Sequence, residues 1–401
     1  MACHVPTKKE EMQKITLRKN QERRIKSGHP WVFSNEIDKL PDNLTPGQTA
    51  QVYDSRGYIV GSGFYNPKSL IAVRLYTRGA LELDLELMVT KISAAARLRQ
   101  SVYPGSSDYR LLYGESDGLP GLLVDRYGDQ LVMEIMSLGM DIRRDLIVEA
   151  LTEVLHPACI YERSDSYSRV LEGLRETESV LLGALKPEVV IEENGLKFAV
   201  NIKHGQKTGW FYDQRDNRLA LRQYVKGKSV LDCFCHTGGF ALNAAAAGAK
   251  SVLGLDISDR AIEQAIKSAG LNNLSGLCQF ESADVLHTLK ERVESGEKYD
   301  VVILDPPAFA KNKKSIESAL KGYKEINLRA MKLLSPGGIL LSCSCSYHVD
   351  DEQFKVMLVD AARDANRTLK LLEFRHQSKD HPVLLACRET QYLKCAIMVV
   401  E

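Results

Sequence analysis

Between residues 229 and 343, short apolar runs alternate with segments of helical pattern. The apolar runs cover residues 229–232, 251–256, 300–305 and 338–343, and the helical segments cover residues 239–247, 259–269 and 316–334. Near-continuous apolar strands that alternate with helices are typical of a parallel sheet covered on both faces. The sequence therefore predicts a doubly wound α/β domain with a mostly parallel sheet, preceded by a hairpin over residues 189–202.

The N-terminal half of the chain has different patterns. Residues 12–85 alternate short β-type runs with turn residues, which predicts a small β-barrel or sandwich. A helical pattern over residues 86–102 is followed by strand-like runs at 122–125 and 130–135, which indicates an α+β arrangement. We therefore expect three domains: a β-barrel over residues 1–85, a central α+β domain over 86–190 and the α/β domain over 191–401.

The charge of the chain is balanced overall but uneven locally. The 401 residues include 53 Lys and Arg against 52 Asp and Glu, so net charge does not indicate a partner. Residues 8–26, 203–228 and 311–332 are basic, and each stretch is either a phosphate-binding surface or a solvated face. No apolar run approaches the ~18 residues of a membrane span, and the nine cysteines lack a framework spacing. We expect a cytoplasmic protein with reduced thiols and no membrane partner.

The predicted strands of the α/β domain end in residues suited to bind a ligand. The first strand leads into a loop of small residues that opens a helix, where a ligand can approach the backbone. The second ends in a carboxylate that can accept both ribose hydroxyls, and an aspartate follows a third strand where a base would lie. These candidates are Asp232, Phe234, Thr237 and Gly238 at the first end, Asp256 at the second and Asp284 at the third.

The end of the fourth strand favours S-adenosylmethionine over NAD as the ligand. The first loop lacks the G-x-G-x-x-G spacing of dinucleotide-binding folds, although aspartates that merely cap helices are an alternative for both ligands. The fourth strand ends in Asp305, Pro306, Pro307, Ala308 and Phe309. Two prolines make a rigid, extended exit from the sheet, which presents an acceptor to a planar base and a ring that can stack on it.

On these motifs, the chain resembles the large-subunit ribosomal RNA cytosine methyltransferases that form 5-methylcytosine, the bacterial YccW-like group. The resemblance covers nearly the whole chain. Residues 28–33, 46–47 and 61–66 are similar to the PUA-type RNA-binding barrel of that group, and residues 114–122 to its central domain. The segment that borders the cofactor pocket and the catalytic half are matched by residues 207–215, 305–307, 321–324 and 344–346.

The resemblance implies what the protein binds and which residues bind it. The implied cofactor is S-adenosylmethionine, the implied substrate is 23S ribosomal RNA, and the implied assembly is a homodimer without a metal. It adds Gln214 and Arg215 to the cofactor site. It also implies that RNA is contacted by Lys207, Phe309, Lys321 and Tyr323.

The chemistry of cytosine methylation requires two further groups. Carbon 5 of cytosine is a weak nucleophile, and a thiolate that adds to carbon 6 converts the ring into an enamine that can attack the methyl group. A carboxyl group such as Asp305 is suited to hold the proton at nitrogen 3. Cys345 lies beyond the end of the adjacent strand and occupies the family position of the nucleophile, whereas Cys343 is interpreted as a small core residue.

Three alternatives remain from the sequence. Cys233 and Cys235 could join Cys343 and Cys345 in a metal site, although C-x-C pairs lack the usual zinc spacing. Related enzymes methylate nitrogen 7 of guanosine, which needs no thiol, and a non-catalytic RNA-binding or ribosome-assembly protein could keep the same fold. Some RNA cytosine methyltransferases carry a second cysteine directly after the two prolines, where this chain has Ala308, so the base that removes the carbon-5 hydrogen is not identified.

Overall fold

The computed structural model describes residues 12–205, 208–310 and 312–401. Contacts divide the chain into two compact units: Met1–Leu185 with Val383–Thr390, and Lys186–Pro382 with Gln391–Glu401. Near its C-terminus the chain thus leaves the second unit, contributes one segment to the first and returns, an excursion that the sequence patterns do not predict. The three predicted domain boundaries stay a prediction. No helix in the described residues is both long and apolar enough to cross a membrane.

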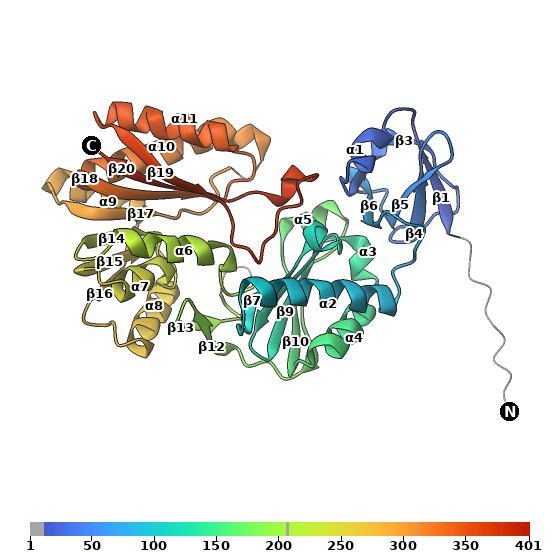
Figure 1. Ribbon diagram of the computed structural model, residues 1–401, viewed down its shortest axis with the longest axis horizontal. Coiled ribbons are helices and arrows are strands. Elements are labelled where there is room, and N and C mark those ends of the chain that lie inside the picture. Colours follow the sequence, from blue (N-terminus) through green and yellow to red (C-terminus); the bar gives the residue numbers. More distant parts are fainter. Residues whose placement is uncertain (1–11, 206–207, 311) are drawn as a thin grey trace. The chain divides into compact units, whose positions relative to one another are not determined.

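The first unit begins with a six-stranded sheet of strand order β2-β6-β5-β4-β1-β3 (Figure 1). Its interior is apolar and includes Ile15, Val32, Val52 and Val73, all fully buried. The closest backbone approach is at Gly63, where a Cβ atom would lie 2.4 Å from the Arg74 carbonyl oxygen, so only glycine fits. The elements are β1 (Gln13–Leu17), α1 (Glu22–Lys26), β2 (Trp31–Phe33), β3 (Ile37–Lys39), β4 (Thr49–Tyr53), β5 (Ile59–Tyr65) and β6 (Ile71–Thr77).

A second sheet in the same unit has five strands in the order β11-β10-β9-β8-β7. Helix α2 (Leu85–Val102) begins at Asp84, whose carboxylate accepts a hydrogen bond from the Leu87 N–H, and its buried residues recur every three or four positions. This arrangement is the α+β region that the sequence predicts. Its other elements are β7 (Asp108–Tyr113), β8 (Leu122–Tyr127), β9 (Gln130–Ile135), α3 (Leu138–Asp141), α4 (Arg144–Leu155), β10 (Cys159–Ser164), α5 (Tyr167–Leu171) and β11 (Thr177–Gly183).

The second unit is built on a seven-stranded sheet of order β16-β15-β14-β17-β18-β20-β19. Strands β14 to β18 are mutually parallel, and β20 runs antiparallel to both of its neighbours. This sheet confirms the predicted doubly wound α/β fold. Its strands are β14 (Ser229–Cys233), β15 (Ser251–Asp256), β16 (Cys278–Ser282), β17 (Tyr299–Leu304), β18 (Leu334–Ser344), β19 (Leu369–Arg375) and β20 (Lys394–Val400).

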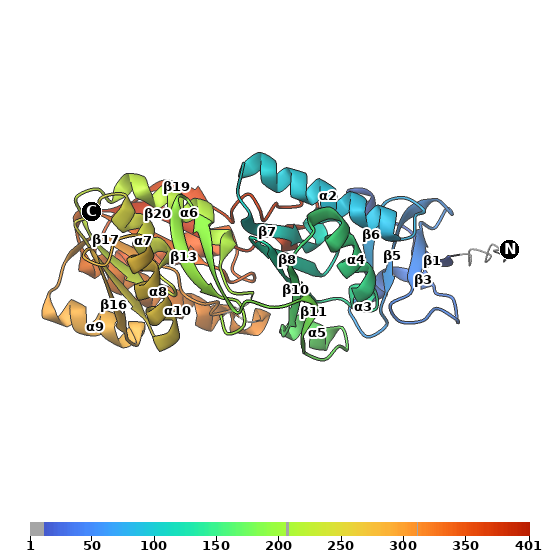
Figure 2. The ribbon, with the colours of Figure 1, turned by 90° about the horizontal axis from the view of Figure 1, so that it is seen from below.

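Helices cover both faces of this sheet, as Figures 1 and 2 show. One face carries α6 (Arg215–Leu221), α7 (Gly239–Ala246) and α8 (Asp259–Leu271); the hairpin of β12 (Glu188–Glu193) and β13 (Leu196–Asn201) lies against α8. The other face carries α9 (Val285–Ser295), α10 (Ile316–Leu333) and α11 (Asp351–Asp364), whose apolar sides share one core with the sheet. The strand order reverses between β14 and β17, the place where such sheets bind ligands.

Candidate active site

A cavity of about 350 Å³ lies at the carboxyl ends of the central strands of the second unit. Its walls come from the segment before and within α6, from the loop after β14, and from the ends of β15, β17 and β18. The lining includes Trp210, Phe211, Gln214, Arg218, Phe234, His236, Thr237, Asp256, Asp284, Asp305, Phe309 and Cys345. Residues more than 130 positions apart in the chain therefore share one cavity, because parallel strands end at the same edge of the sheet.

The loop after β14 has an unusual backbone. Phe234 and His236 have φ angles of 63° and 48°, a region that residues other than glycine seldom occupy. Gly238 follows with φ 80°, and a Cβ atom there would also lie 3.2 Å from the Ala265 side chain and the Phe280 ring. Gly238 is the N-cap of α7 and has no side chain to cap it, and Gly239, the first residue of the helix, lines the cavity.

Asp232 lies behind this loop and is fully buried. One carboxylate oxygen accepts a hydrogen bond of 2.9 Å from the Ala241 N–H, and the other has no partner among the described residues. Burial, together with the nearby charge of Asp305, raises the pKa of Asp232 well above its ordinary value. An acceptor without a partner at such a position is a costly feature unless a ligand supplies the donor.

Arg218 has an unpaired hydrogen-bond donor that complements the unpaired carboxylate oxygen of Asp232. Its guanidinium pairs with Glu193 at 2.9 Å and stacks on the Trp210 ring at 4.4 Å, while its Nε–H has no acceptor among the described residues. Arg218 lines the cavity, and its charge acts on Asp232. A ligand that carries both an ammonium and a carboxylate group, as an amino acid does, would satisfy both residues.

Two further carboxylates are held at the edge of the cavity. Asp256 ends β15 and accepts hydrogen bonds from the His236 N–H at 2.9 Å and the Ser258 N–H at 3.0 Å. Asp284 is exposed and is the N-cap of α9, where it accepts a hydrogen bond of 3.1 Å from the His287 N–H. Helix capping and ligand binding are therefore compatible functions for an aspartate, because Asp284 caps a helix and lines the cavity at the same time.

His236 contributes an uncharged ring to the same wall. Burial lowers the pKa of His236 to about 4, although the charge of Asp256 acts in the opposite direction. Its ring meets the Phe211 ring edge to face, with centroids 5.1 Å apart, and Nδ1 lies 3.2 Å from the Thr237 hydroxyl. At neutral pH this wall is therefore polar but not cationic.

At the other end of the cavity, Asp305 and Cys345 follow the adjacent strands β17 and β18. The Gln214 side-chain N–H donates a hydrogen bond of 2.8 Å to Asp305, and the Gln214 carbonyl oxygen accepts one of 2.7 Å from Asn217. This chain of amides fixes the orientation of the Asp305 carboxylate. The Cys345 thiol is partly exposed and lies 3.8 Å from the Pro306 carbonyl oxygen.

Cys343 and Cys345 differ sharply in their surroundings. Cys343 is fully buried and lies opposite Cys395 of β20 in the sheet register. Burial, together with the neighbouring Cys395, raises the pKa of the Cys343 thiol well above its ordinary value. Cys345 is instead the one of the two that lines the cavity.

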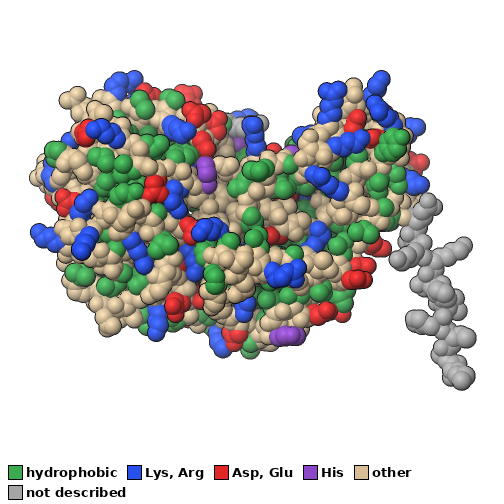
Figure 3. Space-filling view, viewed as in Figure 1, with side chains coloured by type: hydrophobic (Ala, Val, Ile, Leu, Met, Phe, Trp, Pro, Cys, Tyr) green, Lys and Arg blue, Asp and Glu red, His purple; other side chains and the backbone are tan. Residues whose placement is uncertain are grey.

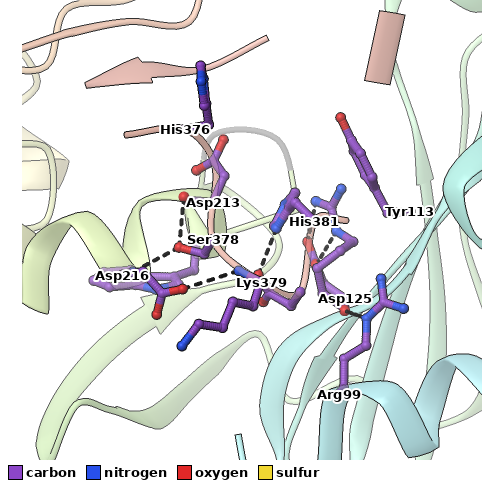
Figure 4. Close-up of polar contacts among 12 residues, drawn as sticks. Arg99, Tyr113, Asp125, Asp213, Asp216, His376, Ser378, Lys379 and His381 are labelled. Atoms are coloured by element: carbon purple, nitrogen blue, oxygen red, sulfur yellow. Dashed lines mark hydrogen bonds and ion pairs between the residues drawn. The ribbon is translucent and has the colours of Figure 1, made fainter. Parts of the chain in front are cut away.

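A hydrogen-bonded group anchors the segment that carries Gln214 and Arg218 (Figure 4). The Ser378 N–H and hydroxyl both donate to the Asp213 carbonyl oxygen, at 2.8 and 2.9 Å, and the Asp216 N–H donates to the Ser378 hydroxyl at 2.8 Å. The Lys379 N–H donates to the Asp216 carboxylate at 3.2 Å. The chain after β19 thereby holds the start of α6 in place.

Several predicted site residues do not line the cavity, and a further one, Lys207, lies outside the described residues. Lys321 is exposed on α10 and pairs with Glu317 at 2.9 Å. Arg215 is buried and, like Asp232 and Gly238, is not among the residues that line the cavity, so its predicted cofactor contact stays a prediction. Tyr323 is also fully buried and cannot contact RNA directly; its hydroxyl instead hydrogen-bonds Ser346 at 2.9 Å.

Tyr323 has a structural function that links the two strand ends. Its ring packs on the Phe309 ring with centroids 4.6 Å apart. The Ser346 hydroxyl accepts a hydrogen bond of 3.0 Å from the Ala310 N–H while it also bonds Tyr323. Tyr323 and Ser346 therefore tie the loop after β17 to the loop after β18.

Sequence reasoning missed Arg218 and interpreted its stretch as a basic surface. Arg215 and Arg218 are both buried, so residues 203–228 are not a simple solvated or phosphate-binding face. Arg218 follows Gln214, the N-cap of α6, by four residues, a spacing compatible with one helix face, but the sequence alone does not show which side chains of this short helix face the cavity.

Within the described residues, Cys233, Cys235, Cys343 and Cys345 are not among the groups whose ligand atoms lie close enough together to hold a metal ion. Among the described residues, the group whose ligand atoms are close enough to hold a metal ion is His29, Cys387 and Glu389 of the first unit. Even there, His29 Nδ1 accepts a hydrogen bond of 3.2 Å from the Trp31 N–H and lies 2.6 Å from an Arg24 nitrogen. Nε2 of His29 faces the Glu389 carboxylate at 3.4 Å.

Comparison with known proteins identifies two families along the chain. The model of the PUA-like domain matches residues 15–78, which is the six-stranded sheet of the first unit. The model of the S-adenosylmethionine-dependent methyltransferases matches residues 175–387. The predicted PUA-type barrel is thereby confirmed.

Curated relatives match almost the whole chain. Ribosomal RNA large subunit methyltransferase I of Aliivibrio fischeri (strain MJ11) is 43% identical over 95% of this chain and 97% of its own length. The protein of the same name from Aeromonas hydrophila subsp. hydrophila is 43% identical over the same shares. Among solved structures, the methyltransferase SMU.776, complexed with SAH, has a TM-score of 0.84 at 23% identity, covering 97% of this chain and 100% of its own.

The cofactor of this family fits the residues of the cavity. The match to the S-adenosylmethionine-dependent methyltransferases confirms the cofactor that the sequence predicts. The amino acid group of S-adenosylmethionine is complementary to the unpaired atoms of Asp232 and Arg218, an assignment that stays a prediction. The chain therefore belongs to the S-adenosylmethionine-dependent methyltransferase family, in the group of ribosomal RNA large subunit methyltransferase I.

Proposed function

We propose that this protein transfers a methyl group from S-adenosylmethionine to carbon 5 of a cytosine in 23S ribosomal RNA. The observation that carries the proposal is the presence of a partly exposed thiol, Cys345, and a carboxylate, Asp305, on the wall of one cavity with the cofactor-binding residues. The names of the relatives support ribosomal RNA of the large subunit as the substrate.

The proposed reaction uses these two groups in sequence. The Cys345 thiolate adds to carbon 6 of the cytosine while the protonated carboxyl of Asp305 gives its proton to nitrogen 3, so that negative charge does not build up on the ring, and the carboxylate takes this proton back when the thiolate leaves. Carbon 5 then attacks the methyl group of the sulfonium, and S-adenosylhomocysteine leaves. A base removes the hydrogen from carbon 5, and the thiolate is expelled with restoration of the aromatic ring.

Methylation of guanosine nitrogen 7 is the competing proposal. That nitrogen is nucleophilic already and needs no thiol, so Cys345 would be idle in the cavity. A non-catalytic assembly protein would need neither Asp305 nor a cofactor, and the unpaired groups of Asp232 and Arg218 argue against it.

The barrel of the first unit supports RNA binding through phosphate groups. Figure 3 shows Lys and Arg side chains close together over the barrel. Exposed basic residues on β1, on α1 and between them are Lys14, Arg18, Lys19, Arg23 and Lys26. We propose that these residues, with Lys321 and Phe309 of the second unit, contact RNA in a cytoplasmic homodimer.

Two measurements test the reaction. Ribosomal RNA from a deletion strain is methylated in vitro, digested to nucleosides and analysed by mass spectrometry; 5-methylcytosine is expected, whereas 7-methylguanosine would refute the proposal. RNA with 5-fluorocytosine at the target is expected to form a stable protein adduct, since fluorine cannot leave as a proton. Peptide mapping should locate the adduct on Cys345.

A third measurement tests the barrel. Replacing Lys19 and Arg23 by Gln should weaken RNA binding and reduce the salt slope of log Kd by about one for each phosphate group that is no longer neutralised. Cofactor affinity should not change, since both side chains are exposed on the first unit. An unchanged salt slope would show that this part of the barrel does not bind RNA.

A further inference from the structure

Lys394 is a buried lysine that the proposed reaction does not use. It begins β20, is 3% exposed and lies opposite Ser344 in the register of β18 and β20. Its ammonium group donates three hydrogen bonds of 2.7 Å, to the carbonyl oxygens of Ser346, Val349 and Tyr392. All three N–H groups of the ammonium are therefore bound to backbone carbonyls.

Two of these carbonyls belong to the loop that follows Cys345. The Val349 N–H also donates a hydrogen bond of 3.2 Å to the Ser346 carbonyl, so residues 346–349 form a turn with the Lys394 ammonium on its inner side. Ser346 is the residue directly after Cys345. Lys394 thus determines the path of the backbone that presents the thiol.

The charge of Lys394 is stabilised by the backbone rather than by a carboxylate. Within the described residues, Lys394 forms no ion pair, whereas a buried cation normally has one. Asp350, the N-cap of α11, and Asp351, which lies 3.6 Å from a His376 nitrogen, contribute only through longer-range attraction. The carbonyl groups of the turn carry only partial negative charges and do not neutralise the ammonium. The ammonium would therefore strongly stabilise a full negative charge nearby.

We propose that Lys394 is a positioning residue for Cys345, because its ammonium shapes the loop that presents the thiol and supplies the counter-charge for the thiolate. The proposal rests on the proposed function of Cys345 as the nucleophile. The thiol proton goes to solvent, and the ammonium remains protonated. Burial lowers the pKa of Lys394 to about 8, so the group is mainly a cation at neutral pH, and Cys345 is among the groups that oppose this lowering.

Two other titratable groups near Cys345 do not supply a positive charge. Asp305 lines the same cavity at the end of β17, and a carboxylate would disfavour the thiolate. Tyr323 of α10 is neutral, since burial and the nearby Cys345 both raise its pKa. Lys394 is thus a cation that acts on this thiol.

The test measures the thiolate itself rather than methylation. Full-length protein is alkylated with iodoacetamide between about pH 5.5 and 9.5, and the rate at Cys345 is followed by peptide mass spectrometry. The wild-type thiol should titrate below the ~8.5 of a free cysteine. Lys394→Met should raise this pKa by about one unit or more, and thus slow alkylation at pH 7 about tenfold. Lys394→Arg, which keeps the charge, should restore a lower value.

Lys370→Met is the matched control, since Lys370 is exposed on β19 of the same sheet and pairs only with Glu401. S-adenosylmethionine binding reports whether each variant is folded. A wild-type alkylation profile in folded Lys394→Met would overturn the proposal. If Lys394→Met does not fold, the wild-type protein alone provides the test. A Cys345 thiol that titrates at or above the pKa of a free cysteine would then overturn the proposal. Failure of the fluorocytosine adduct would instead refute the function of Cys345 and leave the alkylation result unaffected.

Discussion

The two ends of the cavity hold their reactive groups in different ways. At the ends of β14 and β15, Asp232 accepts a hydrogen bond from the Ala241 N–H of α7, and Asp256 accepts hydrogen bonds from the His236 and Ser258 N–H groups of the two βα loops. At the ends of β17 and β18, Asp305 is held by the Gln214 side chain, and the loop after Cys345 by the Lys394 side chain. These partners are 91 and 48 residues away in the chain.

This difference distinguishes a binding end, with Asp232 and Asp256, from a reacting end, with Asp305 and Cys345. Backbone N–H groups in a strained loop form a rigid site for a cofactor that must bind in one orientation. Side-chain partners from distant parts of the chain fix the orientation of the acid and the loop that presents the thiol, as general acid–base and nucleophilic chemistry requires. Substitutions at the two ends should therefore affect different measurements.

The largest effect is expected at the reacting end. Cys345→Ala should lower the rate of RNA methylation by about four orders of magnitude or more, because the attacking atom is removed. Calorimetric affinity for S-adenosylmethionine should stay within about twofold, since the cofactor-binding groups lie at the other end. Cys343→Ala is the matched control and should retain activity while losing about 1 kcal/mol of unfolding free energy. Normal methylation by Cys345→Ala would remove the distinction between the two ends.

The next effect is expected at the binding end. Asp256→Ala should weaken S-adenosylmethionine binding by about 1.5–3 kcal/mol, since charge-assisted hydrogen bonds to the ribose would no longer form. Titration calorimetry measures the change, and methylation at saturating cofactor should fall much less. Unchanged affinity in a folded variant would show that Asp256 serves only the loop, through its bonds to the His236 and Ser258 N–H groups.

A pH effect should also originate at the binding end. Because burial lowers the pKa of His236 to about 4, the folded protein stays unprotonated there while the unfolded chain takes up a proton near pH 6.5. The contribution to stability is therefore complete above pH 6.5 and is lost as the pH falls toward 4, by about 1–3 kcal/mol. His236→Asn tolerates the positive φ and lacks the titration, so its unfolding free energy should fall less between pH 7 and pH 5 in urea experiments. Parallel pH profiles of variant and wild type would contradict this prediction.

The smallest effect concerns the double function of Asp284. Asp284→Ala should cost about 1 kcal/mol of unfolding free energy, because the N-cap of α9 is removed. Asp284→Asn keeps a capping side chain and should keep the stability. If Asp284 also binds the cofactor, both variants should weaken S-adenosylmethionine binding modestly. A loss of stability in Asp284→Ala with unchanged affinity would restrict this residue to capping.

Much of the binding end could be predicted from the sequence because its partners are local. The apolar runs predict parallel strands, and parallel strands place Asp232, Asp256 and Asp305 at one edge of a sheet. Gly238 is likewise recognisable, since a turn between a strand and a helix often needs a positive φ. These inferences depend on short-range periodicity and on the geometry of one fold class.

Burial decided several assignments that periodicity could not make. Tyr323 is fully buried, and Arg215 and Arg218 are both buried, yet of these three residues Arg218 lines the cavity. Helix α6 is so short and so heavily packed that residue type does not indicate which positively charged side chain faces inward. Side-chain direction depends on what packs against the helix from elsewhere in the chain.

By itself, the sequence determined the fold class, the cofactor and the set of strand ends at which the chemistry is placed, because these depend on patterns within a few dozen residues. Only the tertiary structure decided which groups are held together: Gln214 with Asp305, Tyr323 with Ser346, and Lys394 with the loop after Cys345. It also decided that Val383–Thr390 belongs to the first unit. Such contacts join residues far apart in the chain, and their formation depends on packing that no local pattern encodes.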